Sequence, residues 1–288
     1  MFHTAIKVFR MLAACSLLLL LSACYTVEEG PGEESDSTAG SFVWHDLITH
    51  DLETARSFYG GLLGWEFEQA GQREGHPYLL AKRNGKYAGG IIEVPRPTDG
   101  SDYSRWLGYM QIKDINAAVA RTPALGGAVI EAVRDKGEVG KIAAISDAQT
   151  AVLGLIESQF DTGGQVLRDA PGAVIWNELL AADDTQAAAF YSALTGAKAN
   201  TVTRRGGRYT LLESGGKQRA GILKIPLGDT DPLWLSYFAV DDPARAAAQV
   251  EALGGKVILA PSAELREGSM ALVQDPEGAV LALQKWPL

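Results

Sequence analysis

The chain contains one long stretch of sequence twice. The segment 42–65 (FVWHDLITHDLETARSFYGGLLGW) returns as 174–197 (VIWNELLAADDTQAAAFYSALTGA), 132 residues later, and 106–130 returns as 234–258. Each repeat covers about 120 residues, which is far longer than the period of a solenoid repeat. The chain therefore contains a duplicated domain, and positions that agree between the copies identify what both domains need.

Each repeat is itself built from two related units. In all four units a strand-like run ends in aspartate and an alanine-rich helical segment follows: ITHDLETA, IKDINAAV, AADDTQAA and VDDPARAA. An aspartate at this place can cap a helix N-terminus, and the candidates are Asp51, Asp114, Asp183 or Asp184, and Asp241 or Asp242.

Three short strand-like runs follow each helical segment, separated by turn residues such as Asn84-Gly85, which is typical of a hairpin turn. The pattern predicts an α+β fold in which the unit strand–helix–strand–strand–strand occurs four times.

The N-terminal residues are typical of an export signal. Lys7 and Arg10 precede an apolar run that is too short to span a bilayer comfortably, and the run ends in Leu-Ser-Ala-Cys at Cys24. This ending resembles the lipobox of bacterial lipoproteins, which implies a signal peptide at 1–23 and a lipid on Cys24. Residues 24–40 are acidic and rich in Gly and Ser, and are expected to form a disordered tether. Because Tyr25 is not the aspartate that retains such proteins at the inner membrane, we expect an outer-membrane anchor and a domain facing the periplasm.

Cysteine usage and charge exclude several kinds of site. The two cysteines, Cys15 and Cys24, both lie in the N-terminal segment, so the folded part has neither disulfides nor a cysteine nucleophile. The formal net charge of −9 makes nucleic acid a poor partner, because phosphate binding needs a basic face.

The repeat resembles the vicinal oxygen chelate superfamily, which includes glyoxalase I, bleomycin-resistance proteins and extradiol dioxygenases. The matching pieces are D-L-x-x-A-x-x-F-Y at 51–59, the L-G-G turns, and D-P-E-G at 275–278. The resemblance implies two tandem domains at 41–159 and 172–288, joined by a linker at 160–171. Each would be a pair of βαβββ modules with mixed sheets curled around a cleft. The tandem arrangement is closest to the glyoxalase-like proteins and implies a monomer that forms an internal pseudo-dimer.

The resemblance also implies where a divalent metal would be held, by His and Glu on the strands that line the cleft. Counted from the helix-capping and D-P-x-G aspartates, those positions carry side chains that do not bind metals: Trp44, Leu107 and Gly154 in the first copy, and Trp176, Leu235 and Ala282 in the second. Glu93 is a weak candidate for the family's glutamate, and its counterpart is Lys224. No cofactor is predicted, although a divalent metal stays open.

The pair that both copies keep is a tryptophan and a carboxylate two residues apart, Trp44 with Asp46 and Trp176 with Glu178. Strand geometry places both members on one face, which the resemblance makes the cleft face. The indole offers a platform for a planar or cationic ligand. The carboxylate could accept a hydrogen bond or, as a candidate catalytic group, act as a general base.

The alternative is that tryptophan fills a closed cleft and the carboxylate pairs with an arginine or a backbone amide. Two tyrosines that match across the copies, Tyr109 and Tyr237, are further ligand-binding candidates, with core packing as the alternative.

The remaining polar residues are weaker candidates. His45, His50 and His76 lie in the first repeat with no metal-binding spacing, and the run 204–208 (RRGGR) is typical of an exposed hairpin turn. We therefore expect a lipid-anchored protein that binds or sequesters a small organic molecule without a metal. The alternatives are an atypical metal-dependent lyase or dioxygenase using Asp46, Glu178 and Glu93, and a structural or interaction protein of the envelope.

Overall fold

The computed structural model describes residues 39–98, 104–158, 166–226 and 230–287. The expected signal peptide and the lipidation site Cys24 lie outside the described residues. Within these ranges, no helix is long and apolar enough to cross a membrane.

The first repeat folds into an eight-stranded mixed sheet with two α-helices, which we call the first domain. Its elements are β1 (Phe42–Thr49), α1 (Leu52–Leu63), β2 (Glu66–Arg73), β3 (His76–Arg83), β4 (Lys86–Glu93), β5 (Arg105–Gln111), α2 (Ile115–Arg121), β6 (Ala128–Asp135), β7 (Lys141–Ser146) and β8 (Val152–Glu157). The strand order is β2-β3-β4-β1-β5-β8-β7-β6. Two four-stranded modules therefore meet at the antiparallel pair β1 and β5, and each module's last strand runs parallel to its first.

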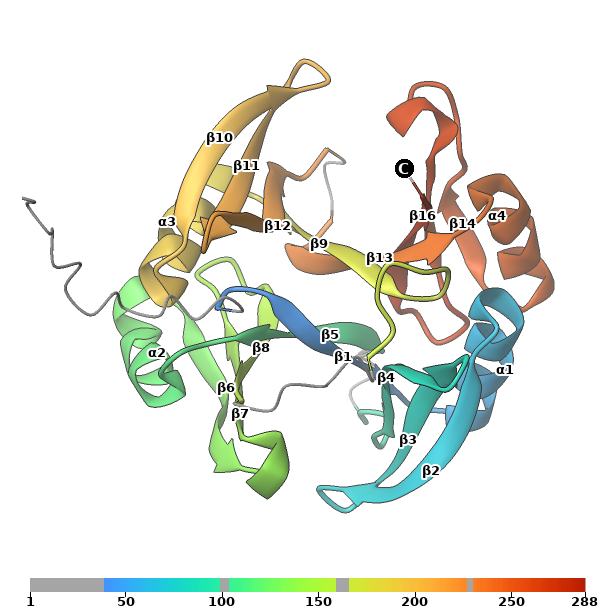
Figure 1. The fold of residues 1–288 in the computed structure, drawn as a ribbon, viewed down its shortest axis with the longest axis horizontal. Coiled ribbons are helices and arrows are strands. Elements are labelled where there is room, and N and C mark those ends of the chain that lie inside the picture. Colours follow the sequence, from blue (N-terminus) through green and yellow to red (C-terminus); the bar gives the residue numbers. More distant parts are fainter. Residues whose placement is uncertain (1–38, 99–103, 159–165, 227–229, 288) are drawn as a thin grey trace, which may run out of the picture. The chain divides into compact units, whose positions relative to one another are not determined.

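The second repeat forms the second domain with the same order, β10-β11-β12-β9-β13-β16-β15-β14. Its elements are β9 (Val174–Ala181), α3 (Asp184–Thr195), β10 (Lys198–Arg204), β11 (Gly207–Ser214), β12 (Lys217–Lys224), β13 (Leu233–Val240), α4 (Pro243–Ala252), β14 (Lys256–Leu259), β15 (Met270–Gln274) and β16 (Val280–Lys285). The predicted α+β fold of two tandem βαβββ pairs is confirmed, and each sheet curls (Figure 1).

The aspartates before the helices perform the predicted local role. The carboxylate of Asp51 accepts hydrogen bonds from the backbone N–H groups of Glu53 and Thr54, and Asp183 does the same for α3. Asp114 and Asp242 cap the other two helices. Helix α1 ends at Gly64, whose φ of 66° lies in the left-handed region that glycine adopts without strain.

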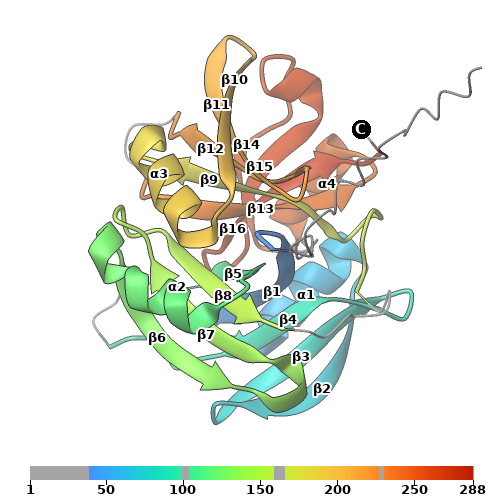
Figure 2. The ribbon, with the colours of Figure 1, turned by 60° about the vertical axis from the view of Figure 1, so that its left-hand side comes forward.

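The cores are shared between the two domains. One core joins α1 and β2–β4 of the first domain to β13, α4, β15 and β16 of the second, and the other joins the two middle modules. Helix α1 accordingly packs beside α4, and α2 beside α3 (Figures 1 and 2). The helix-bearing faces of both sheets are therefore buried against each other, and the opposite, helix-free face of each sheet is left to carry a site.

Buried tyrosines from the repeated Phe-Tyr pair link the two domains. The hydroxyl of Tyr59 on α1 donates to Asp275 Oδ2 at 2.9 Å, and that of Tyr191 on α3 donates to Asp147 Oδ2 at 3.1 Å. The indole N–H of Trp106 donates to the Tyr59 hydroxyl at 3.0 Å. Burial raises the pKa of Asp275 to about 6, although hydrogen bonds from Tyr59 and two backbone amides favour its ionised form.

A second interdomain link involves His45 on β1. Its Nε2 lies 2.9 Å from Oδ1 of Asn177, which occupies the same position on β9. Both side chains are buried, and burial lowers the pKa of His45 to about 4. His45 thus joins the two sheets on their buried faces, away from the helix-free faces.

Candidate functional site

Strand alternation on β1 decides which side chains reach the helix-free face. His45 and Leu47 are buried toward the interdomain core, so Trp44 and Asp46 project from the opposite face. On β9, Asn177 lies on the interdomain side in the same way, which leaves Trp176 and Glu178 on the helix-free face. The tryptophan–carboxylate pair of the two repeats therefore lies at equivalent places on the two sheets.

Asp46 is the centre of a buried polar cluster in the first domain, which we call cluster 1. Its carboxylate accepts hydrogen bonds from Trp44 Nε1 and from the hydroxyl of Tyr78, each at 2.8 Å, and forms an ion pair with Arg73. Arg73 Nη2 also donates to the hydroxyl of Tyr109 at 2.9 Å. Asp46 is only 1 % exposed, so its charge depends on these neighbours.

Glu178 is the centre of the matching cluster in the second domain, cluster 2. Arg266 Nη2 lies 2.9 and 2.8 Å from the two carboxylate oxygens, and the hydroxyl of Tyr237 donates to Oε2. Here Trp176 Nε1 donates to the hydroxyl of Tyr209, at 3.0 Å. Each cluster thus contains one carboxylate, one arginine, one tryptophan and two tyrosines.

The arginines of the two clusters come from different elements. Arg73 ends β2, whereas Arg266 lies in a short turn between β14 and β15, where both it and Glu267 have positive φ, 48° and 57°. Arg204, which occupies the place of Arg73 in the second repeat, lies over the ring of Tyr209 at 4.7 Å and contributes to no ion pair there among the described residues. Non-glycine residues at positive φ are strained, so the turn holds Arg266 at a cost.

The cluster tyrosines remain neutral hydrogen-bond donors. Burial, reinforced by the neighbouring carboxylates, raises the pKa of Tyr78, Tyr109 and Tyr237 well above the ordinary value. A ligand at either cluster would meet neutral hydroxyls, a guanidinium and an indole around a buried carboxylate.

Two glycines at equivalent positions make room for the clusters. A Cβ on Gly90 of β4 would lie 2.0 Å from the Tyr78 hydroxyl and 2.2 Å from Asp46 Oδ1, and one on Gly221 of β12 would lie 1.9 Å from the Tyr209 hydroxyl. These distances are far below van der Waals contact. Both domains therefore have a glycine, without a side chain, where a tyrosine hydroxyl lies against the strand.

The comparison with known proteins settles the family. CFP32 of Mycobacterium tuberculosis (strain CDC 1551 / Oshkosh), a protein provisionally named a glyoxylase, is 31 % identical over 255 residues, which cover 88 % of this chain and 97 % of CFP32. The profile described as the Glyoxalase/Bleomycin resistance protein/Dioxygenase superfamily matches residues 174–283. The chain belongs to this superfamily.

Three further proteins are similar to this chain. The anthracycline biosynthesis protein DnrV of Streptomyces peucetius is 36 % identical over 131 residues, covering 40 % of this chain and 48 % of DnrV. The Mn(II)-bound glyoxalase from Novosphingobium aromaticivorans matches with a TM-score of 0.54 at 13 % identity, covering 86 % of this chain and 82 % of that one. The 2,3-dioxygenase LapB from Pseudomonas sp. KL28 gives 0.57 at 13 % identity, covering 86 % and 92 %. At these identities the two structures show a shared fold.

The glyoxalase superfamily fold implies a divalent metal, and the donor atoms on the helix-free faces do not fit one. The positions that the resemblance assigns to ligands carry Trp44, Leu107 and Gly154 in the first domain, none of which offers a metal-binding lone pair. Among the described residues, no three His, Cys, Asp or Glu side chains come together in a group that could hold a metal ion.

The candidate Glu93 lies at the end of β4, away from cluster 1. Its Oε2 accepts a hydrogen bond from the backbone N–H of Leu52 at 3.2 Å, at the start of α1, and Glu157 plays the same part for Ile115 of α2. Glu93 therefore stabilises a helix N-terminus. Of the two other histidines, His50 contacts the backbone oxygen of Val94 through Nδ1 at 3.0 Å, and His76 begins β3, half-buried.

Sequence reasoning named Trp44, Asp46 and Tyr109 with their counterparts, and the structure brings each set together. It missed Tyr78 and Tyr209, although both recur at matching positions in the repeats and could have been found there. The partners Arg73 and Arg266 share no such signal, because they come from non-equivalent elements. In the run 204–208, Arg204 covers Tyr209, and Arg208 pairs with Asp184 at 2.9 Å.

Proposed function

We propose that this member of the superfamily binds a small planar organic molecule on the helix-free faces of its sheets, without a metal ion. The observation that carries the proposal is the recurrence of one polar cluster, on Asp46 and on Glu178, at the same place in the two domains, although its arginine comes from a different element in each. The arginine pairs match the structural alternative, but a charge is costly to bury, and its retention in both domains beside a half-buried tryptophan favours a binding role.

The surroundings of each cluster suit an aromatic ligand that carries a polar group. Trp44 and Tyr78 are half-buried, so parts of their rings remain accessible beside the buried carboxylate. Apolar side chains cover the rest of the face, including Leu107 and Ile142 in the first domain and Leu235 and Leu272 in the second. A flat ring can stack on the indole while its hydroxyl or carbonyl exchanges hydrogen bonds with the cluster. The name of the relative DnrV supports this class, because anthracyclines contain fused planar rings.

The proposal is tested by titrating the full-length protein with an anthracycline and following tryptophan fluorescence. We expect saturable quenching that weakens by about tenfold in Trp44→Ala or Trp176→Ala, because loss of a stacking platform removes on the order of 1–2 kcal/mol. Trp286→Ala, which alters a tryptophan outside both clusters, serves as the control and should bind like the wild type. Equal binding by all three variants would overturn the proposal.

The proposal that binding needs no metal ion is tested by a separate measurement. Elemental analysis of protein prepared without chelator should find far less than one equivalent of Zn, Ni, Mn or Fe, and the anthracycline titration should be unchanged by EDTA. Near-stoichiometric metal that is lost in Asp46→Asn would instead point to an atypical metal-dependent enzyme.

We further propose that the chain is anchored to the outer membrane by a lipid on Cys24, facing the periplasm. The support is the Leu-Ser-Ala-Cys sequence that ends the apolar N-terminal run, followed by an acidic, Gly- and Ser-rich segment. Labelling cells with a radioactive fatty acid should mark the wild-type chain and leave Cys24→Ala unlabelled. Cys15→Ala is the matched control, and label retained by Cys24→Ala would contradict the proposal.

A further inference from the structure

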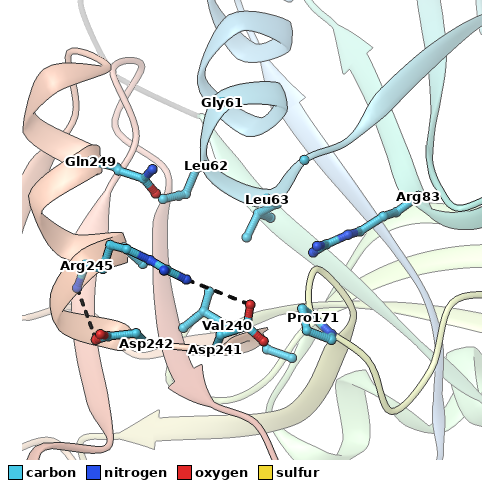
Figure 3. A pocket seen from close by; sticks show the side chains of 13 residues that line it. Gly61, Leu62, Leu63, Arg83, Pro171, Val240, Asp241, Asp242, Arg245 and Gln249 are labelled. Carbon is cyan, nitrogen blue, oxygen red and sulfur yellow. Dashed lines mark hydrogen bonds and ion pairs between the residues drawn. The ribbon is translucent and has the colours of Figure 1, made fainter.

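A cavity of about 350 Å³ lies outside both clusters, where the two domains meet. It is bounded by the C-terminal end of α1, by Pro171, and by the junction of β13 with α4 (Figure 3). Ligand pockets begin at roughly 300 Å³, and a volume of 350 Å³ corresponds to roughly a dozen non-hydrogen atoms if each takes the share of a liquid water.

Arg83 is the charged group in this cavity that has no partner. Its side chain reaches from the end of β3 toward the cavity and is half-buried, and no hydrogen bond or ion pair to it occurs within the described part of the chain (Figure 3). The other charges are balanced. Arg245 Nη2 lies 3.9 Å from Asp241 Oδ2, and Asp242 accepts hydrogen bonds from two backbone amides at the start of α4.

The duplication provides an internal reference for this arrangement. At the equivalent place beside α3, Arg121 donates to the backbone oxygen of Ala193 at 3.1 Å, and the residue that matches Arg121 beside the cavity is the shorter Gln249. On each side an arginine of one domain packs against a positive-φ glycine that precedes the other domain: Arg219 against Gly40 and Arg83 against Gly172.

The two arginines differ in what they bind. Arg219 donates to Ser41 Oγ at 2.6 Å and to the backbone oxygen of Ser214 at 3.1 Å. The residue that matches Ser41 beside Arg83 is Ala173, which offers no hydroxyl. Arg219 is therefore satisfied from within the chain, whereas Arg83, beside the cavity, has no such partner among the described residues.

We propose that this cavity is a second binding site, which takes the carboxylate of a small organic acid on Arg83. A guanidinium binds a carboxylate through two parallel hydrogen bonds, and partial burial strengthens such a pair relative to water. Asp241 and Asp242 line the same cavity, so a singly charged carboxylate is favoured over the doubly charged phosphate. This site is independent of the clusters on Asp46 and Glu178.

Calorimetric titration of the full-length protein tests the proposal with benzoate, benzamide and inorganic phosphate as probes. We expect benzoate to bind with one-to-one stoichiometry at the cavity, its neutral isostere benzamide to show no heat of binding, and phosphate to bind at least tenfold more weakly. Absence of benzoate binding, or tighter binding of phosphate, would overturn the assignment.

Three variants locate the binding. Arg83→Gln should weaken benzoate by about tenfold or more, since one charge-assisted bidentate contact is lost. Gln249→Arg should reduce binding as strongly, because it places in the cavity lining the longer side chain that contacts the end of α3 at the equivalent place. Arg56→Gln removes the same charge from an exposed pair with Glu53 on α1 and should leave binding unchanged.

A folding defect would not be mistaken for a loss of binding. Because Arg83 has no hydrogen bond or ion pair with any described residue, Arg83→Gln should melt within a degree or two of the wild type. Arg83→Lys keeps the charge but loses the planar, two-pronged donor group. Benzoate that binds Arg83→Gln as well as the wild type, and is weakened by Trp44→Ala, would place the anion at cluster 1. That result would overturn the cavity proposal and leave the proposed function intact.

Discussion

Replacing Arg73 by methionine is expected to lower the free energy of unfolding by about 3 kcal/mol, because one partner of a buried ion pair is removed and the other keeps its charge. Asp46 is 1 % exposed and would retain only hydrogen bonds from neutral groups, those of Trp44 and Tyr78. Methionine keeps the unbranched stem of arginine as far as the guanidinium, so most of the loss reports the missing charge. Urea unfolding at pH 7.5 measures the change.

The same substitution at Arg56 is the matched control. Arg56 pairs with Glu53 on the exposed surface of α1, where an ion pair contributes little, and Arg56→Met should change stability by less than about 0.5 kcal/mol. Combining Arg73→Met with Asp46→Asn should recover part of the loss, since the buried charge is then gone. A loss at Arg73 no larger than at Arg56 would show that Asp46 reaches solvent.

Acidification is expected to destabilise the protein through His45, and His45→Asn should remove this effect. The pKa of His45 is lowered from 6.5 to about 4 by burial, so the folded protein holds the neutral imidazole. The stabilisation is present above pH 6.5 and is lost as the pH falls toward 4. Its size is on the order of 3 kcal/mol, from the linkage between the pKa change and the free energy of folding.

Asp275 works in the opposite direction over nearly the same range. Burial raises its pKa from 3.8 to about 6, so its contribution is fully present below pH 3.8 and is lost as the pH rises through 6. The two effects offset each other in the wild type. The unfolding free energy of His45→Asn should therefore rise relative to the wild type between pH 7 and pH 4.5, and that of Asp275→Asn should fall. Parallel curves for all three proteins, measured by urea unfolding across this range, would contradict both assignments.

Most of the fold can be predicted from the sequence of the two repeats. Four aspartate-capped helices and the Asn84-Gly85 hairpin follow from local rules and are present in the structure, as are the glycines that end α1 and α3, whereas α2 ends at Thr122 and α4 at Leu253. The pair Trp44 and Asp46 was visible because strands alternate and because the second copy has Trp176 and Glu178. The two repeats can be compared with each other in the way that two aligned homologues are compared.

The arginines that pair with these carboxylates could not be predicted from the sequence. Arg73 and Arg266 neutralise equivalent carboxylates from a strand end and from a strained turn, so no comparison of the repeats could pair them. The link between Tyr59 and Asp275 joins residues at opposite ends of the folded part, and both motifs fit packing within one domain equally well. Sequence patterns report the face that a side chain occupies. The arginine contacts depend on where a strand end and a turn fold over that face, and the Tyr59 contact depends on how the two sheets meet.

The sharing of cores between the domains has a consequence for how the chain is made. The middle modules can complete their common core, which ends at Trp234, while the ribosome is still translating β16. The first module emerges earliest, yet its apolar helix face must wait for α4 and for Leu283 at the far end of the chain. Nascent chains would thus expose Phe58 and Leu62 longest, which makes α1 the natural segment for a chaperone to shield during synthesis.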